Sequence, residues 1–228
     1  MPEFKKLFND LIRKVEGHKE EPYVDTTGNP TIGTGLNLND HDVRGLLNIR
    51  GIDPEQVKTG QRRMVASELD DVQKHYVDKR EKLVRDKLGP DLYDQLPPHQ
   101  KASIMSMGYQ SLNNIGPNLT SYIAGNDPIG AIREMVLNTN KHKDPGILKR
   151  RFEEAEMFGG PLDFSAAFKT MTPEEKRQMR EMFDKIENEH SRNEVNQKYG
   201  SYLAEPKPQH YSKLQKLMTG KIGSNNQD

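Results

Sequence analysis

An apolar stripe followed at once by a glutamate and a glycine constrains the fold more than any other feature of this chain. The stripe recurs every three or four residues and consists of Phe4, Leu7, Phe8, Leu11, Ile12 and Val15. This period predicts an amphipathic helix over residues 2–15 with one buried face. Gly17 is of the residue type that most often ends a helix. We therefore expect a helix that presents the carboxylate of Glu16 at its C-terminal end.

The segment over residues 22–36 changes character. It reads "PYVDTTGNPTIGTGL" and is rich in Thr, Gly and Pro. Short β-prone pieces between turn residues predict a small, irregular antiparallel hairpin system. Helical patterns return from residue 39 onward, and the longest helix is expected over residues 66–88. The predicted fold class is therefore α+β, mainly α.

A domain end is predicted at Gly159-Gly160-Pro161. Residues 1–160 would form one domain, and residues 161–228 a C-terminal extension. Thr172 and Glu175 form a capping box that predicts a helix at about residues 172–190, with apolar positions on one side. The sequence beyond residue 190 is polar and is expected to form a tail.

Composition excludes several classes of protein. The chain has no cysteine and a formal net charge of zero, and neither part departs from balance by more than one charge. Disulfides and thiolate chemistry are thus excluded, and nucleic acid is not an expected partner. No histidine spacing suggests a metal site, and no apolar run is long enough for a membrane span. The N-terminus also lacks the pattern of a signal peptide.

Two carboxylates stand on different predicted local structures. Glu16 ends an apolar helix, where partial loss of solvent favours the protonated form of a carboxyl group. Asp25 lies in a polar loop, where solvent favours the ionised form. Cleavage of a glycosidic bond needs one carboxyl group of each kind, as proton donor and as base or charge partner. A pair of this kind also arises by chance, so it carries little weight alone.

A longer pattern around this pair resembles the catalytic signature of phage-type lysozymes, the T-even phage muramidase and endolysin family. It consists of Glu16-Gly17, Tyr23, Asp25, Gly28, Thr31-Ile32-Gly33 and Gly35, without a gap. "KASIMSMGYQSL" resembles the buried central helix of that family, and "GILKRRFEEAEMF" its C-terminal motif. The resemblance covers residues 1–160 and does not extend to residues 161–228.

The resemblance implies a muramidase that hydrolyses the β-1,4 bond between N-acetylmuramic acid and N-acetylglucosamine. Glu16 would be the general acid, Asp25 the second carboxylate, and Thr31 would help to hold the attacking water in an inverting mechanism. Without the separation of the carboxylates, a retaining mechanism stays open. No metal or cofactor is implied.

The same resemblance implies a two-lobe fold, with a β-hairpin lobe, a helical lobe and the substrate cleft between them. Tyr109 and Gln110 would line this cleft, although Tyr109 fits a place in the core equally well. Arg151 matches the family arginine that pairs with the catalytic glutamate, and Arg150 is the alternative at one position earlier.

The remaining expectations concern location and partners. Peptidoglycan is anionic, and a neutral hydrolase forgoes electrostatic attraction to it. A chain tethered by residues 161–228 to other virion proteins would not need that attraction, so a virion-associated phage lysozyme is slightly favoured. A lytic endolysin, made in the host cytoplasm and acting on the cell wall, is the rival. A catalytically silent structural or sugar-binding protein of a virion is the alternative outside the enzymes.

Overall fold

The computed structural model describes residues 3–25, 28–138, 145–186 and 189–204. Its helices and strands, in chain order, are α1 (Glu3–Glu16), β1 (Lys19–Val24), β2 (Pro30–Gly33), β3 (Leu36–Asn37), α2 (His41–Ile49), α3 (Pro54–Lys58), α4 (Ala66–Leu88), α5 (Pro90–Gln95), α6 (Pro98–Gln110), the 3₁₀ helix η1 (Leu112–Asn114), α7 (Pro117–Ala124), α8 (Pro128–Leu137), α9 (Pro145–Thr170), α10 (Pro173–Asp184) and α11 (Glu189–Leu203). The prediction of a mainly helical chain with a small antiparallel sheet is confirmed.

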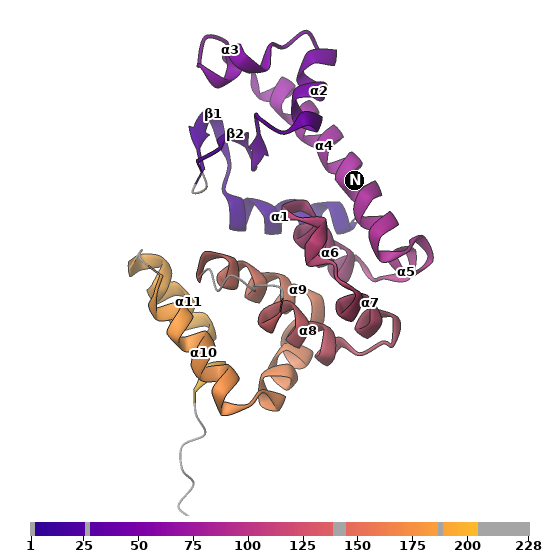
Figure 1. The fold of residues 1–228 in the computed structure, drawn as a ribbon, viewed down its shortest axis with the longest axis vertical. Coiled ribbons are helices and arrows are strands. Elements are labelled where there is room, and N and C mark those ends of the chain that lie inside the picture. The colour runs from indigo at the N-terminus through magenta and orange to yellow at the C-terminus, as the bar shows by residue number, and fades with distance from the viewer. Residues whose placement is uncertain (1–2, 26–27, 139–144, 187–188, 205–228) are drawn as a thin grey trace, which may run out of the picture.

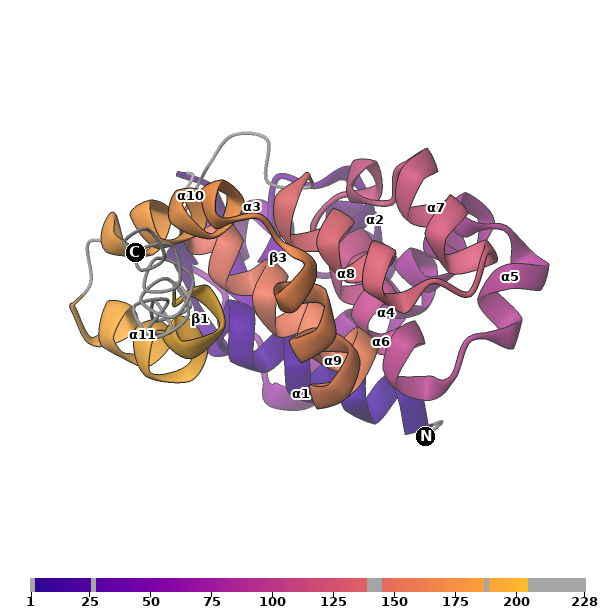
Figure 2. The ribbon, with the colours of Figure 1, turned by 90° about the horizontal axis from the view of Figure 1, so that it is seen from below.

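The strands lie at one end of the molecule and most helices at the other. Figure 1 shows the sheet with α2 and α3 at the top, and α6 to α11 gathered below. Helix α4 runs from the upper group to the lower, and α1 lies where the two groups meet. Seen from below in Figure 2, α10 and α11 lie beside α9 at one end of the molecule, and α5 and α7 lie at the opposite end of the molecule.

The sheet is the predicted antiparallel hairpin system, with strand order β1-β2-β3. Tyr23 pairs with Thr31, and Thr31 pairs in turn with Asn37. The register between β1 and β2 shifts between Lys19 and Tyr23, which makes the first strand irregular. One face of β2 is closed by the core, since Ile32 is only 1% exposed.

Helix α4 occupies Ala66–Leu88, the range that its periodicity predicts. The side chain of Glu68 accepts a hydrogen bond from the Val65 amide at 3.1 Å, which closes the first turn. Buried residues recur along one side of the helix: Leu69, Val72, Tyr76, Val77, Val84 and Leu88. The helix therefore ties the sheet end to the rest of the core through its apolar stripe.

Helix α6 forms the centre of the helical end. Every residue from Ala102 to Tyr109 is buried. Helices α1, α4 and α9 all pack against α6. The prediction that this segment is a buried helix is confirmed.

Helix α9 crosses the position at which a domain end was predicted. Gly160 has a non-helical backbone (φ 65°, ψ −178°), and the helix resumes with Pro161 after this kink. Phe152, before the kink, contacts Phe164 and Phe168, after it, at ring-centroid distances of 6.0 and 5.1 Å. Residues on both sides of Gly160 thus belong to one hydrophobic core.

The helical part of the C-terminal segment is longer than predicted. Thr172 and Glu175 form the expected capping box, but the segment divides into α10 and α11, and α11 reaches Leu203. The buried residues of α11, Val195, Tyr199 and Leu203, recur every four residues. Three apolar residues in an otherwise polar sequence are too few for their spacing to predict this helix. The part of the predicted polar tail beyond Ala204 lies outside the described residues.

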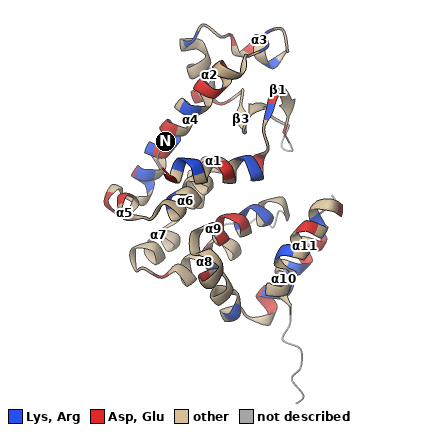
Figure 3. Cartoon of the chain, turned by 180° about the vertical axis from the view of Figure 1, so that it is seen from behind, with Lys and Arg blue, Asp and Glu red and all other residues tan. Residues whose placement is uncertain are grey.

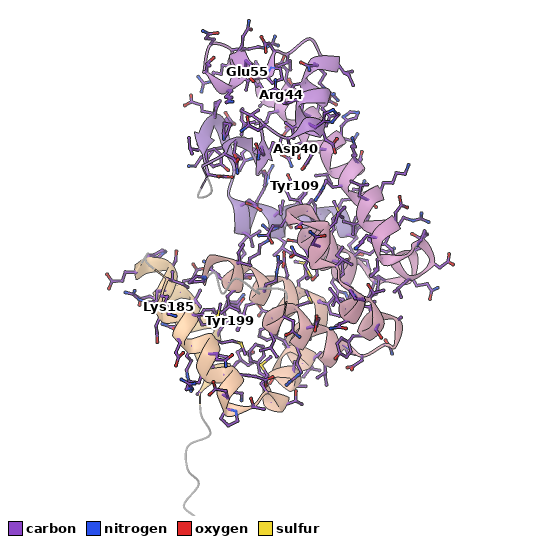
Figure 4. All side chains as sticks on the ribbon, viewed as in Figure 1. Asp40, Arg44, Glu55, Tyr109, Lys185 and Tyr199 are labelled. Atoms are coloured by element: carbon purple, nitrogen blue, oxygen red, sulfur yellow. The ribbon has the colours of Figure 1, made fainter. Side chains whose placement is uncertain are left out.

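The apolar side of α10 is already occupied by the chain itself. Met179 is 3% exposed and Phe183 is fully buried. Phe183 packs on Phe152 at a ring-centroid distance of 4.9 Å, and Tyr199 of α11 packs there at the same distance. In Figure 4, Tyr199 lies on the side of α11 that faces α9. This face of α10 is therefore core rather than a docking surface for another protein.

None of the helices in the described ranges combines the length and apolar character that crossing a bilayer requires.

Candidate active site

Glu16 lies at the junction of three parts of the fold. It is the last residue of α1, and its side chain is 29% exposed. The Gly17 amide donates to the Arg13 carbonyl at 2.9 Å, so the helix closes directly beneath Glu16. Burial of Phe8 and Ile12 fixes the rotation of α1 and thereby the direction of Glu16.

The turn between β2 and β3 holds the other side of Glu16. Gly35 has φ +76°, a left-handed conformation that glycine adopts without strain. A Cβ atom on Gly35 would lie 3.5 Å from Cδ and 3.6 Å from Oε2 of Glu16. The carboxyl group therefore rests directly against the backbone of the hairpin turn.

Arg150 of α9 completes the surroundings of Glu16. Its Nη1 donates to Oε1 of Glu16, and the Arg150 side chain is 7% exposed. Of the two neighbouring arginines that the sequence left open, Arg150 therefore makes the contact with Glu16. The preferred assignment, Arg151, does not hold for this pairing, since Arg151 bonds to Glu154 and Gln110 instead.

Both arginines share one buried carboxylate, Glu154, which is 0% exposed. Nε of Arg150 donates to Oε1 of Glu154 at 3.0 Å, and Nη1 of Arg151 donates to Oε2. Burial opposes the charged form of Arg150, but Glu154 and Glu16 outweigh it and raise the pKa of Arg150 above its ordinary value. Burial instead lowers the pKa of Arg151, with Glu154 acting against the shift and Arg150 adding to it.

Asp25 lies directly after β1, in a loop that its own hydrogen bonds close. Oδ1 accepts from the Asn29 amide at 2.8 Å, and the Gly28 amide donates to the Asp25 carbonyl at 3.0 Å. The Asp25 amide donates in turn to the Asn29 carbonyl at 2.9 Å. The Asp25 carboxylate is thus held by the loop that presents it, as is common for Asp in turns.

Tyr23 connects the two carboxylates electrostatically. Burial raises the pKa of the Tyr23 hydroxyl, and the charges of Glu16 and Asp25 raise it further. The hydroxyl of Tyr23 therefore lies within the field of both carboxylates. Tyr23 belongs to the pattern that carries the resemblance, two residues before Asp25, but its residue type alone predicts no role in the site.

Thr31 lies beneath the loop of Asp25. It is 2% exposed and pairs with Tyr23 across the sheet. Its hydroxyl donates to the Asn29 carbonyl at 3.1 Å. The structure thus places Thr31 on the strand next to Tyr23 and joins it to Asp25 through Asn29.

Tyr109 is part of the core, so the expectation that it lines a cleft is wrong. It is 6% exposed, and burial raises the pKa of its hydroxyl. This hydroxyl donates to the Thr34 carbonyl at 2.8 Å and accepts from Nε2 of Gln73 at 3.0 Å. Figure 4 shows Tyr109 between the sheet end and α6. Tyr109 therefore supports the turn of Gly35 from below.

Gln110, the next residue, is exposed, and its Oε1 accepts from Arg151 and from Nδ2 of Asn114. Gln110 thus holds Arg151 at the surface end of the buried ion cluster. Gln110 is thus linked to Glu16 through Arg151, Glu154 and Arg150.

A groove of about 660 Å³ lies between α1 and α4 and reaches Thr34. Its lining includes Arg13, His18 and Lys74, but neither Glu16 nor Asp25. Nδ1 of His18 and Oγ1 of Thr34 are 2.9 Å apart at its end. This groove is therefore separate from the two carboxylates.

Comparison with protein-family models and with curated proteins finds no match to this chain.

Proposed function

We propose that the chain is a glycoside hydrolase of the muramidase type, which cleaves the β-1,4 bond between N-acetylmuramic acid and N-acetylglucosamine in peptidoglycan. The observation that carries the proposal is the fixed position of Glu16. A helix end, a glycine turn and a buried arginine hold its carboxyl group from three sides, while the side chain stays 29% exposed. A reacting group needs this combination of fixed position and access.

The second carboxylate supports the same chemistry. Asp25 is presented by a closed loop, and Tyr23 lies within the field of both Asp25 and Glu16. Hydrolysis of a glycosidic bond uses two carboxyl groups on either side of the bond. The sheet end and the helical end would form the two lobes of a lysozyme-like fold, with the glycan between them.

In the proposed reaction, Glu16 gives its proton to the glycosidic oxygen as the bond from the anomeric carbon to that oxygen breaks. Asp25 takes a proton from a water molecule, whose oxygen bonds to the anomeric carbon. The resemblance assigns Thr31 to holding this water; Thr31 is only 2% exposed, and its hydroxyl donates to the Asn29 carbonyl while its oxygen keeps acceptor capacity. The outcome is inversion at the anomeric carbon, and no cofactor takes part.

The first test is the loss of turbidity of purified peptidoglycan. Wild type is expected to clear the suspension, and Glu16→Gln at equal folded concentration to lose activity by about a factor of 10² to 10⁴. Glu3→Gln, at the opposite end of the same helix, is the matched control and should keep full activity. If wild type clears nothing, the chain is instead a silent structural or sugar-binding protein on this scaffold.

We further propose that the protein acts from the phage particle rather than as a free endolysin. Figure 3 shows basic and acidic residues interspersed along α1, α4 and α10, and the formal net charge of the chain is zero. A particle-bound hydrolase needs no electrostatic attraction to the wall. Mass spectrometry of purified particles should detect the chain, and its absence there would favour the endolysin.

A further inference from the structure

We propose that Glu154 is a positioning residue of this site, and that it keeps Glu16 able to act as an acid by neutralising one of two buried arginines. The inference rests on the proposed glycosidase function and names how the charge of its acid is set. Arg150 donates to both Glu154 and Glu16, so Glu154 acts on Glu16 through Arg150.

All three nitrogens of the Arg150 guanidinium donate hydrogen bonds within the protein. Nε donates to Glu154 at 3.0 Å, Nη2 donates to the Ser106 carbonyl at 2.9 Å, and Nη1 donates to Glu16. Ser106 also donates from Oγ to Oε1 of Glu154 at 2.6 Å, inside the core. Glu154 and Ser106 therefore fix the plane of Arg150 independently of Glu16.

Glu154 reduces the net positive charge of this cluster. Arg150 and Arg151 carry two positive charges, and Glu154 contributes one negative charge at 0% exposure. The cluster behind Glu16 thus has one net positive charge. Without Glu154 it would have two, and in a buried site each of them would favour the ionised form of Glu16. An acid held ionised has no proton to give.

Other groups face Glu16 from the remaining elements. Tyr23 from β1 and Tyr109 from α6 interact with its charge, and both hydroxyls are neutral at ordinary pH because their pKa values are raised. The turn from β2 to β3 brings the backbone of Gly35 against the Glu16 carboxyl group. Among the described residues Arg150 is the charged side chain that forms an ion pair with Glu16, and Glu154 is its counter-charge. Asp25 and Lys19 carry the further charges nearby, and both act on Tyr23.

The test is the pH profile of reducing-end release from purified peptidoglycan. Glu154→Gln raises the net charge of the cluster, so the high-pH limb of the profile should move down by about one pH unit. Arg151→Met lowers the net charge, so the same limb should move up. The double variant removes one charge of each sign and should return the limb to near its wild-type position.

These variants separate electrostatics from packing. A merely structural role would lower activity at every pH without displacing the limb. Glu154→Gln leaves Arg151 buried without a counter-charge, and such a loss is strongly destabilising. If it fails to fold, Arg151→Met still decides, because Glu154 then keeps Arg150 and Ser106 as partners. Glu174→Gln, an exposed change of the same chemistry on α10, should leave the profile unchanged.

The outcomes also separate this inference from the proposed function. Opposite displacement by the two single variants supports the inference, as does the upward displacement by Arg151→Met where Glu154→Gln does not fold; a folded Glu154→Gln whose limb stays in place contradicts it. An active wild type whose limb does not move in a folded Arg151→Met variant contradicts the inference and leaves the glycosidase intact. A wild type that releases no reducing ends at any pH contradicts the proposed function, and the inference with it.

Discussion

Nη1 of Arg150 donates a hydrogen bond to Oε1 of Glu16, across a sequence separation of 134 residues. This contact joins the last residue of α1 to the first half of α9. Both helices pack against the buried helix α6, so neither is free to change the geometry alone. The candidate acid therefore depends on the packing of the whole helical end, and the predictions below test that dependence.

Gly35→Ala is expected to impair activity more than its cost in stability explains. A side chain in the left-handed conformation costs about 1–2 kcal/mol, and the new methyl group would lie against Glu16 at ordinary contact distance. Gly51→Ala is the matched control, since Gly51 has φ +67° and open space around its Cβ position. Urea unfolding should show similar losses in both variants, whereas only Gly35→Ala should lose activity. Equal activity in the two would show that the contact is unimportant.

Tyr109→Phe is expected to destabilise the protein by about 1–3 kcal/mol, because the buried Thr34 carbonyl loses its donor. The maximal rate should fall, since the turn of Gly35 loses its support. The KM for soluble peptidoglycan fragments should stay unchanged, because Tyr109 is buried and cannot touch a sugar. Thermal unfolding and steady-state kinetics measure the two effects. A raised KM with unchanged stability would instead indicate a saccharide-binding residue.

The ion pairs of Glu153 should make the free energy of unfolding depend on pH. It is 5% exposed and accepts hydrogen bonds from Lys14 of α1 and Lys198 of α11. Burial opposes its charge, but the two lysines outweigh burial and lower its pKa below the ordinary 4.5. A lowered carboxylate pKa stabilises the fold above pH 4.5, and this stabilisation is lost as the pH falls through the lowered value.

Glu153→Gln should therefore cost about 2 kcal/mol at neutral pH, and the difference from wild type should shrink in acid. Unfolding free energies of both proteins across the acid range measure it. Glu174→Gln, at an exposed ion pair, should show a smaller difference at neutral pH. A constant deficit of Glu153→Gln at all pH values would mean that the loss comes from packing and not from charge.

Truncation after Gly160 is expected to abolish folding. It removes the partners of Phe152 from α10 and α11 and exposes a core aromatic side chain. Loss of packing around one such ring alone costs about 3–5 kcal/mol. Truncation after Ala204 keeps the described core, which ends at Leu203, and should retain a cooperative thermal transition. A soluble, cooperatively folded chain of residues 1–160 would show that this core is not shared.

Local patterns predicted the parts of the fold that depend on neighbouring residues. The stripe of α1, the end of that helix at Glu16 and the range of α4 all follow from periodicity and capping. The choice between Arg150 and Arg151 does not, because adjacent helical residues point about 100° apart. Only the rotation of α9 against α1 decides which of them meets Glu16, and that rotation is a property of the packed core.

The burial of Tyr109 and the length of α11 could not be predicted from the sequence either, because both depend on contacts with distant residues. A tyrosine at the end of an apolar helix suits a core and a binding surface equally well, and the Thr34 carbonyl that accepts its hydrogen bond is 75 residues away. The stripe of α11 is too sparse to stand out until Phe152 and Phe164 are in place beside it. Pairing across the fold, rather than local preference, supplies both features.

The chemical identity of the new reducing end tests most directly whether the chain is a muramidase with Glu16 as its acid. Purified peptidoglycan digested with wild type and with Glu16→Gln is reduced with borohydride, and the products are identified by mass spectrometry. We expect reduced N-acetylmuramic acid in the wild-type digest and its near absence with Glu16→Gln, while both proteins unfold cooperatively. A new end of any other kind, no cleavage by wild type, or equal cleavage by both proteins would contradict the assignment of a muramidase with Glu16 as its acid.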